Sequence, residues 1–152
     1  MKKFPAWILL LPVFLFFAAG CGGPNTAMVG LKVELSGVTR AGDGRAHVSW
    51  RIVNPNIVPY LVARTSHKVY LDGVLVGTVD DRDALAVPAQ SKPQRTAPLN
   101  SAGAAGDAAI AKAVATGSAS YRLESTVTIR LFGENTDKSD LTASGTVPVT
   151  AG

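Results

Sequence analysis

The sequence predicts an all-β domain, an antiparallel β-sandwich with one short helix. Three observations lead to this prediction. Apolar and polar residues alternate in several segments, which is the pattern of strands with one buried face. Clusters of Gly, Asp, Asn and Pro separate these segments at intervals of about 8–15 residues. A single Ala-rich segment interrupts the alternation and predicts the helix.

The first two strands are expected at residues 29–38 and 45–53. In both segments every second residue is apolar, and Trp50 lies on the apolar face of the second one. We therefore place Trp50 in the core. The Gly- and Asp-containing cluster at residues 41–44 is a turn signal, so the two strands are expected to pair as antiparallel neighbours.

Asn54, Pro55 and Asn56 stop the second strand. Proline has a fixed φ and no N–H for the strand ladder, and Asn side chains bond readily to nearby backbone. We interpret these three residues as a structural turn in which the side-chain amides cap exposed backbone groups. The alternative is a recognition loop that contacts a partner.

A central hairpin is expected next. A longer strand at residues 60–71 leads into Asp72-Gly73, a strong signal for a tight turn. The returning strand at residues 74–79 contains Gly77, which predicts a bulge because glycine inside a strand often marks an irregularity.

The rest of the chain carries one helix among further strands. Asp107 lies near the expected start of the helix and Gly117 just past its end. In order, we expect a short apolar segment at 84–89, an edge strand with two prolines at 91–99, the helix at 101–117, a strand at 121–132, a polar turn at 133–140 and a last strand at 141–149.

The first 20 residues have the features of a secretory signal peptide: two early lysines, an apolar stretch and small residues before Cys21. The ending Ala-Ala-Gly-Cys resembles the bacterial lipobox, although Ala18 stands where Leu is most common. The resemblance implies diacylglycerol on the Cys21 sulfur, cleavage before Cys21 and acylation of the new amino group. The alternative is an uncleaved membrane-spanning helix, and the short apolar stretch with Pro12 in its middle argues against it.

This interpretation divides the chain into a signal peptide at 1–20, a lipidated tether at 21–28 and the sandwich domain at 29–150. The expected partner is a membrane, reached through the lipid anchor of a bacterial cell-envelope protein. Gly22 rather than Asp follows the cysteine. By resemblance to Gram-negative sorting rules, this favours the outer membrane, facing the periplasm.

The charge of the chain argues against a nucleic-acid partner. The formal net charge is +4, and Lys2 and Lys3 belong to the leader. Without them, 13 basic and 11 acidic side chains leave a charge of about +2. Proteins that bind nucleic acid normally carry a clustered basic patch, and this sequence has no run of like charges.

The order of landmarks along the domain resembles the group-2 late embryogenesis abundant family, also called the WHy (water stress and hypersensitive response) domain. These landmarks are Asn54-Pro55-Asn56, Asp72-Gly73, Val87-Pro88-Ala89, Tyr121-Arg122-Leu123 and Gly145-Thr146-Val147-Pro148-Val149. The resemblance spans residues 31–149. It implies an immunoglobulin- or fibronectin type III-like β-sandwich with one helix, found in dehydration-linked proteins, and no agreed catalytic residues.

We identify no metal site and no cofactor. Asp80, Asp81 and Asp83 lack the Gly and terminal Glu of a calcium-binding loop, so we expect a solvated loop. His47 and His67 are the only histidines. A zinc site needs three or four ligands, and the single cysteine is assigned to the lipid.

We also identify no catalytic residues. Residues 117–121 lack the second Gly of a nucleophile elbow, and their serines are expected to end the helix. The function that follows is non-enzymatic: a monomeric envelope protein that protects membranes or proteins during water loss. The rival is an accessory lipoprotein that acts as an interaction module on other envelope proteins.

Overall fold

The computed structural model describes residues 30–130 and 135–152, and within them the fold is all-β apart from one helix, as predicted. The predictions for Cys21, the leader and the tether fall outside the described residues. The elements are β1 (Lys32–Arg40), β2 (Ala46–Val53), β3 (Tyr60–Leu71), β4 (Val74–Asp81), β5 (Leu85–Val87), β6 (Gln94–Pro98), β7 (Asn100–Ser101), α1 (Ala104–Thr116), β8 (Ser118–Arg130) and β9 (Thr136–Ala151).

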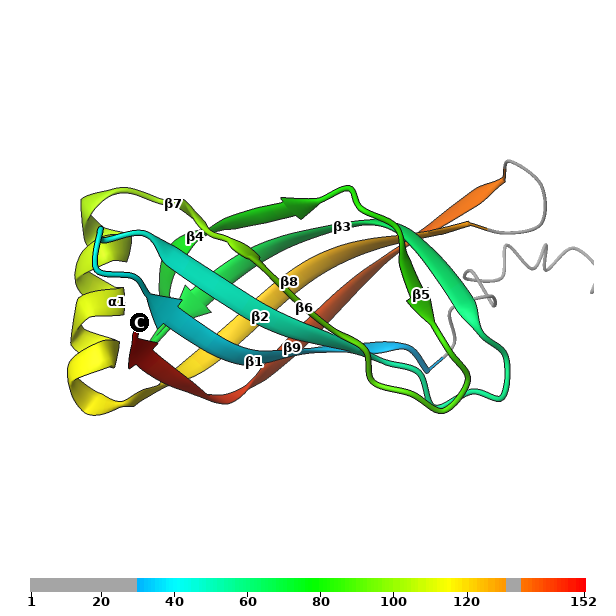
Figure 1. The fold of residues 1–152 in the computed structure, drawn as a ribbon, viewed down its shortest axis with the longest axis horizontal. Coiled ribbons are helices and arrows are strands. Elements are labelled where there is room, and N and C mark those ends of the chain that lie inside the picture. The colour runs from blue at the N-terminus through cyan, green and yellow to red at the C-terminus, as the bar shows by residue number, and fades with distance from the viewer. Residues whose placement is uncertain (1–29, 131–134) are drawn as a thin grey trace, which may run out of the picture.

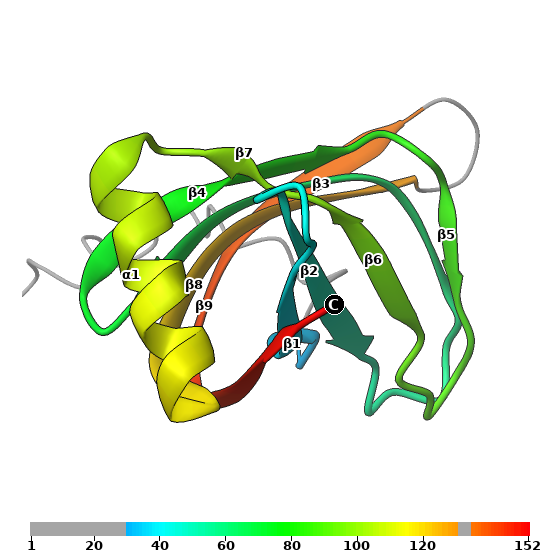
Figure 2. The same ribbon diagram turned by 60° about the vertical axis from the view of Figure 1, so that its left-hand side comes forward.

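The strands form one folded-over sheet. Across the described residues their order is β6-β2-β1-β9-β8-β3-β4-β7, and β5 pairs with the start of β3. The sheet bends so that β1, β2 and β6 lie opposite β3, β8 and the longer part of β9 (Figure 1, Figure 2). The result is a nearly closed, barrel-like sheet around a single core.

One strand pairing departs from the antiparallel expectation. The end of β9 leaves β8 at Pro148 and runs parallel to β1, where Val149 lies opposite Val38. Proline has no N–H to donate, so its position suits the point where the strand changes partner. The Gly152 N–H then donates to the Arg40 carbonyl at 2.8 Å, which extends this contact to the end of the chain.

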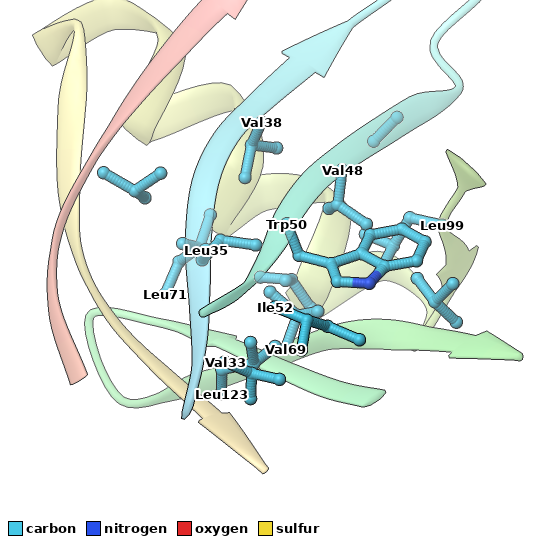
Figure 3. Packing of buried hydrophobic residues seen from close by; sticks show 14 of the residues in the cluster. Val33, Leu35, Val38, Val48, Trp50, Ile52, Val69, Leu71, Leu99 and Leu123 are labelled. Atoms are coloured by element: carbon cyan, nitrogen blue, oxygen red, sulfur yellow. The ribbon is translucent and has the colours of Figure 1, made fainter. Parts of the chain in front are cut away.

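The core lies between the two halves of the folded sheet. Figure 3 shows residues of β1 and β2, among them Trp50 and Ile52, pointing toward Val69 of β3 and Leu123 of β8. Trp50 is only 1% exposed, which confirms its predicted place in the core. Alternation puts the apolar residues inward on each strand, since successive side chains point to opposite faces.

The central hairpin follows the sequence closely. β3 has the predicted bounds, and Asp72 and Gly73 both take positive φ, at 47° and 82°, as a tight hairpin turn requires. Val69 pairs with Gly77 but Tyr70 pairs with Leu75, so β4 carries one extra residue next to Gly77. The predicted bulge is therefore confirmed.

The helix α1 covers the end of the sheet at which this hairpin turns (Figure 2). It ends at Thr116, and Gly117 caps it in the left-handed conformation with φ 78°. Its own side chains Ile110 and Ala113 are buried. Gly106 is required for close packing, because a Cβ there would lie 2.9 Å from the carbonyl oxygen of Val76.

Two expectations for the chain after Gly117 are wrong. The serines do not end the helix, since β8 begins at Ser118. The polar segment before residue 141 is not all turn, because residues 136–140 of β9 pair with residues 126–130 of β8. Residues 136–140 are polar on both faces and therefore lack the one-sided apolar pattern that marks a strand.

The two edges of the folded sheet are joined by Arg95 of β6. Its guanidinium lies 3.5 Å from the Asp81 carboxylate of β4. The same group donates to the carbonyl oxygens of Asp83 and Ala84, at 3.1 and 3.0 Å. Arg95 therefore spans the opening that strand pairing leaves between β6 and the end of β4.

Candidate functional site

The buried amide of Asn54 organises one end of the domain. Asn54 is 1% exposed, and its Nδ2 donates to the carbonyl oxygens of Val58 and Pro88, at 2.9 and 3.0 Å. Its Oδ1 accepts from the Asn56 N–H at 3.0 Å, and its own N–H donates to the Ser91 carbonyl at 2.9 Å. One side chain thus ties the β2–β3 loop to the loop between β5 and β6.

The loop between β5 and β6 contributes to the same junction. The Gln90 N–H donates to the Asn56 carbonyl at 3.0 Å, and the Ser91 hydroxyl donates to the Pro88 carbonyl at 2.7 Å. Gln90 takes a φ of 52°, a conformation that L residues adopt rarely. The hydrogen bonds on either side hold it there.

The first described residue lies against this junction. A Cβ on Gly30 would be 3.4 Å from Pro55 Cγ and 3.8 Å from Asn56 Oδ1. Beyond Asn56, the loop turns outward, and the side chains of Ile57 and Val58 are 82% and 53% exposed. The end of the domain where the described chain begins therefore presents two aliphatic side chains to its surroundings.

A second group of polar residues lies inside the core. His67 of β3 and Ser125 of β8 are 1% and 4% exposed, and His67 Nδ1 lies 2.7 Å from Ser125 Oγ. The Trp50 ring packs against the imidazole with centroids 4.8 Å apart. Within the described residues, the His67 Nε2 and Trp50 Nε1 atoms make no hydrogen bond.

Burial lowers the pKa of His67 to about 4, because the apolar surroundings disfavour the charged imidazolium. A histidine next to a serine hydroxyl has the composition of a base and a nucleophile. Here both side chains are enclosed by the core, so a substrate has no access to them. This geometry makes the pair part of the interior packing.

Sequence reasoning did not single out this pair, although a signal for it exists. His67 is in phase with Val69 and Leu71, and Ser125 is in phase with Leu123 and Val127. Polar residues at in-phase positions of strongly alternating strands are expected to point inward. Phase alone could therefore have identified both as buried.

Asp80 and Asp81, which lie at the end of β4 and not in the expected solvated loop, are paired with arginines. Asp80 binds the Arg64 guanidinium through two hydrogen bonds of 2.7 and 2.8 Å, and Arg82 reaches the same carboxylate at 3.1 Å. The hydrogen bond from Arg64 is the main reason that the pKa of Asp80 is lowered. No group of three or more His, Cys, Asp or Glu side chains in the described residues is arranged to hold a metal ion.

The serines after the helix are placed differently from a nucleophile elbow. An elbow is a turn from strand to helix, whereas Gly117 connects α1 to β8. The Ser120 hydroxyl donates to the Asp72 carboxylate at 2.9 Å, and the Ser120 N–H donates to the same oxygen at 3.1 Å. These bonds lower the pKa of Asp72 and fix the β3–β4 turn against β8.

Across residues 30–130 and 135–152, α1 is the single helix, and it is neither long nor apolar enough to cross a bilayer.

Comparison with known proteins identifies the fold and no family. No model of a protein family and no curated protein matches the chain. A solution structure of an Arabidopsis thaliana protein shares 15% identity over 78% of each chain, with a TM-score of 0.51. A putative late embryogenesis abundant protein shares 13% identity over 82% of this chain and 74% of its own, with a TM-score of 0.48.

A crystal structure of a protein from Archaeoglobus fulgidus is also similar. It shares 16% identity over 78% of this chain and 94% of its own, with a TM-score of 0.46. At these identities the similarity concerns the fold alone. It rests on the Arabidopsis thaliana protein with the TM-score of 0.51. The structures that resemble this chain thus include a putative late embryogenesis abundant protein.

Proposed function

We propose that this chain is a lipid-anchored, non-enzymatic protein of the bacterial cell envelope that protects membranes or proteins during water loss. The observation that carries the proposal is the order of sequence landmarks that resembles the WHy domain. The landmarks lie along one fold: Asn54 follows the end of β2, Asp72-Gly73 turns the central hairpin, and the last landmark lies in β9.

The order of the strands supports the finer fold class that the resemblance implies, a sandwich of the fibronectin type III or immunoglobulin kind. In that class, one sheet joins the first two strands to a later one, and the other joins the third strand to the last two. Here β1 and β2 continue into β6, while β3 pairs with β8, which pairs with β9. We propose that the folded sheet belongs to this class.

Two features favour a protein that acts by binding other molecules at its surface over an enzyme that turns over a substrate. The histidine and serine that could act as base and nucleophile are enclosed in the core. Among the aspartates, Asp80 is engaged by two arginines and Asp72 by Ser120. In this proposal the domain binds or shields other molecules and consumes no substrate.

The anchor in this proposal is acylated Cys21, with the domain a monomer held at the membrane by residues 21–28. Several acyl chains on one residue make a stable anchor, since each buried CH₂ contributes about 0.8 kcal/mol. In a Gram-negative cell the proposed location is the outer membrane, on its periplasmic side.

Drying experiments test the protective role. Deleting the gene should lower survival after desiccation or hyperosmotic shock, and the purified protein should preserve a labile enzyme through drying better than an equal mass of albumin. A Trp50→Ala variant is the matched control, because it leaves the surface unchanged and weakens the fold.

Other outcomes would contradict the proposal. Equal survival with and without the gene, and protection no better than albumin, would remove the protective role. Crosslinking of one dominant envelope protein, together with a defect in the absence of water stress, would favour the docking module. Hydrolysis or group transfer that one polar substitution abolishes without unfolding would make the protein an enzyme.

A further inference from the structure

We propose that the exposed tip of the β2–β3 loop rests on the lipid bilayer and orients the domain upon it. This aliphatic tip consists of Ile57 and Val58, with Pro55 and Pro59 on either side. The inference rests on the lipid anchor proposed above and adds a contact surface to it. The occupant of the tip is the membrane that holds acylated Cys21.

The exposure of the aliphatic tip is the first argument. Ile57 is 82% exposed and Val58 is 53% exposed, higher than any other large hydrophobic side chain in the described residues. A single exposed aliphatic residue is ordinary on a protein surface. Two adjacent ones at the end of a projecting loop form a small apolar surface that water solvates poorly.

The rigidity of the aliphatic tip is the second argument. Asn54 binds the Val58 carbonyl, and the two prolines fix their own φ angles. The loop is therefore held so that its aliphatic side chains point away from the core. A contact surface that is already ordered loses little conformational freedom when it binds.

The route of the chain is the third argument. Gly30 lies against Pro55, so the tether joins the domain beside the aliphatic tip. Gly30 is nine residues after Cys21, and a chain of that length reaches at most about 30 Å when fully extended. The opposite end is a further strand length away, since the 12 residues of β3 cover about 40 Å.

This geometry sets the tip apart from the other exposed apolar residues. Val74 and Leu75, each 38% exposed, lie at the opposite end, in the hairpin beside α1 (Figure 1). The tether thus holds the aliphatic tip nearer to the bilayer than the Val74 hairpin.

Positive charge beside the tip is the fourth argument. Lys32 pairs with Val53 in the strand register, and Lys92 follows Ser91, whose carbonyl binds Asn54. Both lysines are exposed, and neither forms an ion pair with the described residues. Aliphatic residues flanked by lysines suit an anionic phospholipid surface, where each lysine favours binding.

The size of the effect is sufficient to orient a tethered domain. Full burial of one aliphatic side chain corresponds to roughly a ten- to hundredfold preference for the apolar phase. The acyl chains already keep the domain at the surface, so this preference acts on orientation and not on recruitment. We therefore expect one dominant orientation, with the helix end pointing away from the membrane.

Fluorescence quenching tests this orientation in the full-length acylated protein. The protein is reconstituted in vesicles of phosphatidylethanolamine and phosphatidylglycerol, and Ile57→Cys is labelled with a polarity-sensitive fluorophore. Cys21 is the only native cysteine, and its acylated sulfur does not react. Val74→Cys is the matched control, because Val74 is an exposed aliphatic residue at the opposite end. We expect blue-shifted emission and quenching by brominated lipid at position 57, and neither at position 74.

A second measurement removes the contribution of the fluorophore at the tip itself. The label is moved to Ala89→Cys, an exposed position in the loop between β5 and β6, and read in the native background and in Ile57→Ser/Val58→Ser. We expect brominated lipid to quench the label in the native background and the quenching to be lost in the double variant, whose thermal midpoint should be unchanged because both side chains are exposed.

The outcomes separate this inference from the anchor. Mass analysis and vesicle flotation report acylation independently of the labels. Acylated, floating protein whose position 57 label stays in water overturns the orientation and leaves the anchor intact. Protein without acyl chains that fails to float overturns both. A label shielded in native membranes but exposed in pure lipid vesicles assigns the aliphatic tip to a protein partner and overturns the bilayer contact.

Discussion

Acidification should destabilise the domain through His67. The imidazole is buried, and burial lowers its pKa from the ordinary 6.5 to about 4. In the unfolded chain the same side chain takes up a proton near its ordinary pKa. Between these two pKa values the unfolded state binds more protons than the folded state. The free energy of unfolding therefore falls as the pH falls from about 6.5 to about 4, and this contribution levels off below that range.

The magnitude follows from the two pKa values. Each pH unit between them contributes about 1.4 kcal/mol, so the loss between pH 7 and pH 4 is roughly 3 kcal/mol. For a domain of this size that is a large part of a typical total stability. Asp72 and Asp80 have lowered pKa values, so their contributions are lost as the pH falls through the carboxyl range, mostly below the His67 window. Both carboxylates are exposed to solvent and add little.

Urea unfolding at a series of pH values measures this effect. The native protein is compared with His67→Asn, whose amide can keep a hydrogen bond to Ser125 while carrying no titratable group. We expect the variant to lose most of the decline between pH 6.5 and pH 4. His47→Asn is the control and should keep the native decline, since His47 lies on the outer face of β2. Equal pH profiles for the native protein and His67→Asn would refute the reasoning.

Three further predictions concern single residues. Trp50→Ala should destabilise the domain by about 3–5 kcal/mol in urea unfolding, as for other large aromatic core residues, and an unchanged midpoint would contradict its burial. Asn54→Ala should cost on the order of 1–3 kcal/mol, because it removes the buried amide that donates to the Val58 and Pro88 carbonyls; a thermal midpoint equal to the native one would contradict that. Cys21→Ser should abolish acylation, and intact-mass analysis that finds a free Cys21 thiol in the mature native protein would reject the lipid anchor.

The elements that local pattern specifies were predictable from the sequence. β3 has the expected bounds because alternation and a following Asp-Gly turn define both its face and its end. The helix end at Gly117 was predictable for the same reason, since a glycine there adopts the left-handed conformation without strain. Both signals lie within a few residues of the feature that they predict.

Features that depend on distant partners were not predictable in this way. The parallel contact between Val38 and Val149 joins the two ends of the domain, and no local pattern encodes it. The strand character of residues 136–140 comes from pairing with β8, since their own residues show no buried face. The seam that Arg95 spans likewise exists only once β6 and β4 face one another.

The Asn54 turn lies between these two cases, and it suggests how the end of the domain is built. The sequence predicted a turn with capping amides, but not that one amide would bind the Pro88 carbonyl 34 residues away. The residue that holds the loop in place and the residues that the loop exposes are thus close together in the chain, but they face opposite sides. Asn54 contacts the fold, whereas the side chain of Ile57 faces outward.

Two variants should therefore distinguish the residue that supports the loop from the residues that contact the bilayer. Asn54→Ala should lower the thermal midpoint and also weaken the quenching at position 57, because the loop loses its tie. Ile57→Ser/Val58→Ser should leave the midpoint unchanged and abolish the bilayer signal of the Ala89→Cys label. If the double variant unfolds the domain as readily as Asn54→Ala does, the aliphatic side chains belong to the folded structure, and their exposure is not a membrane contact.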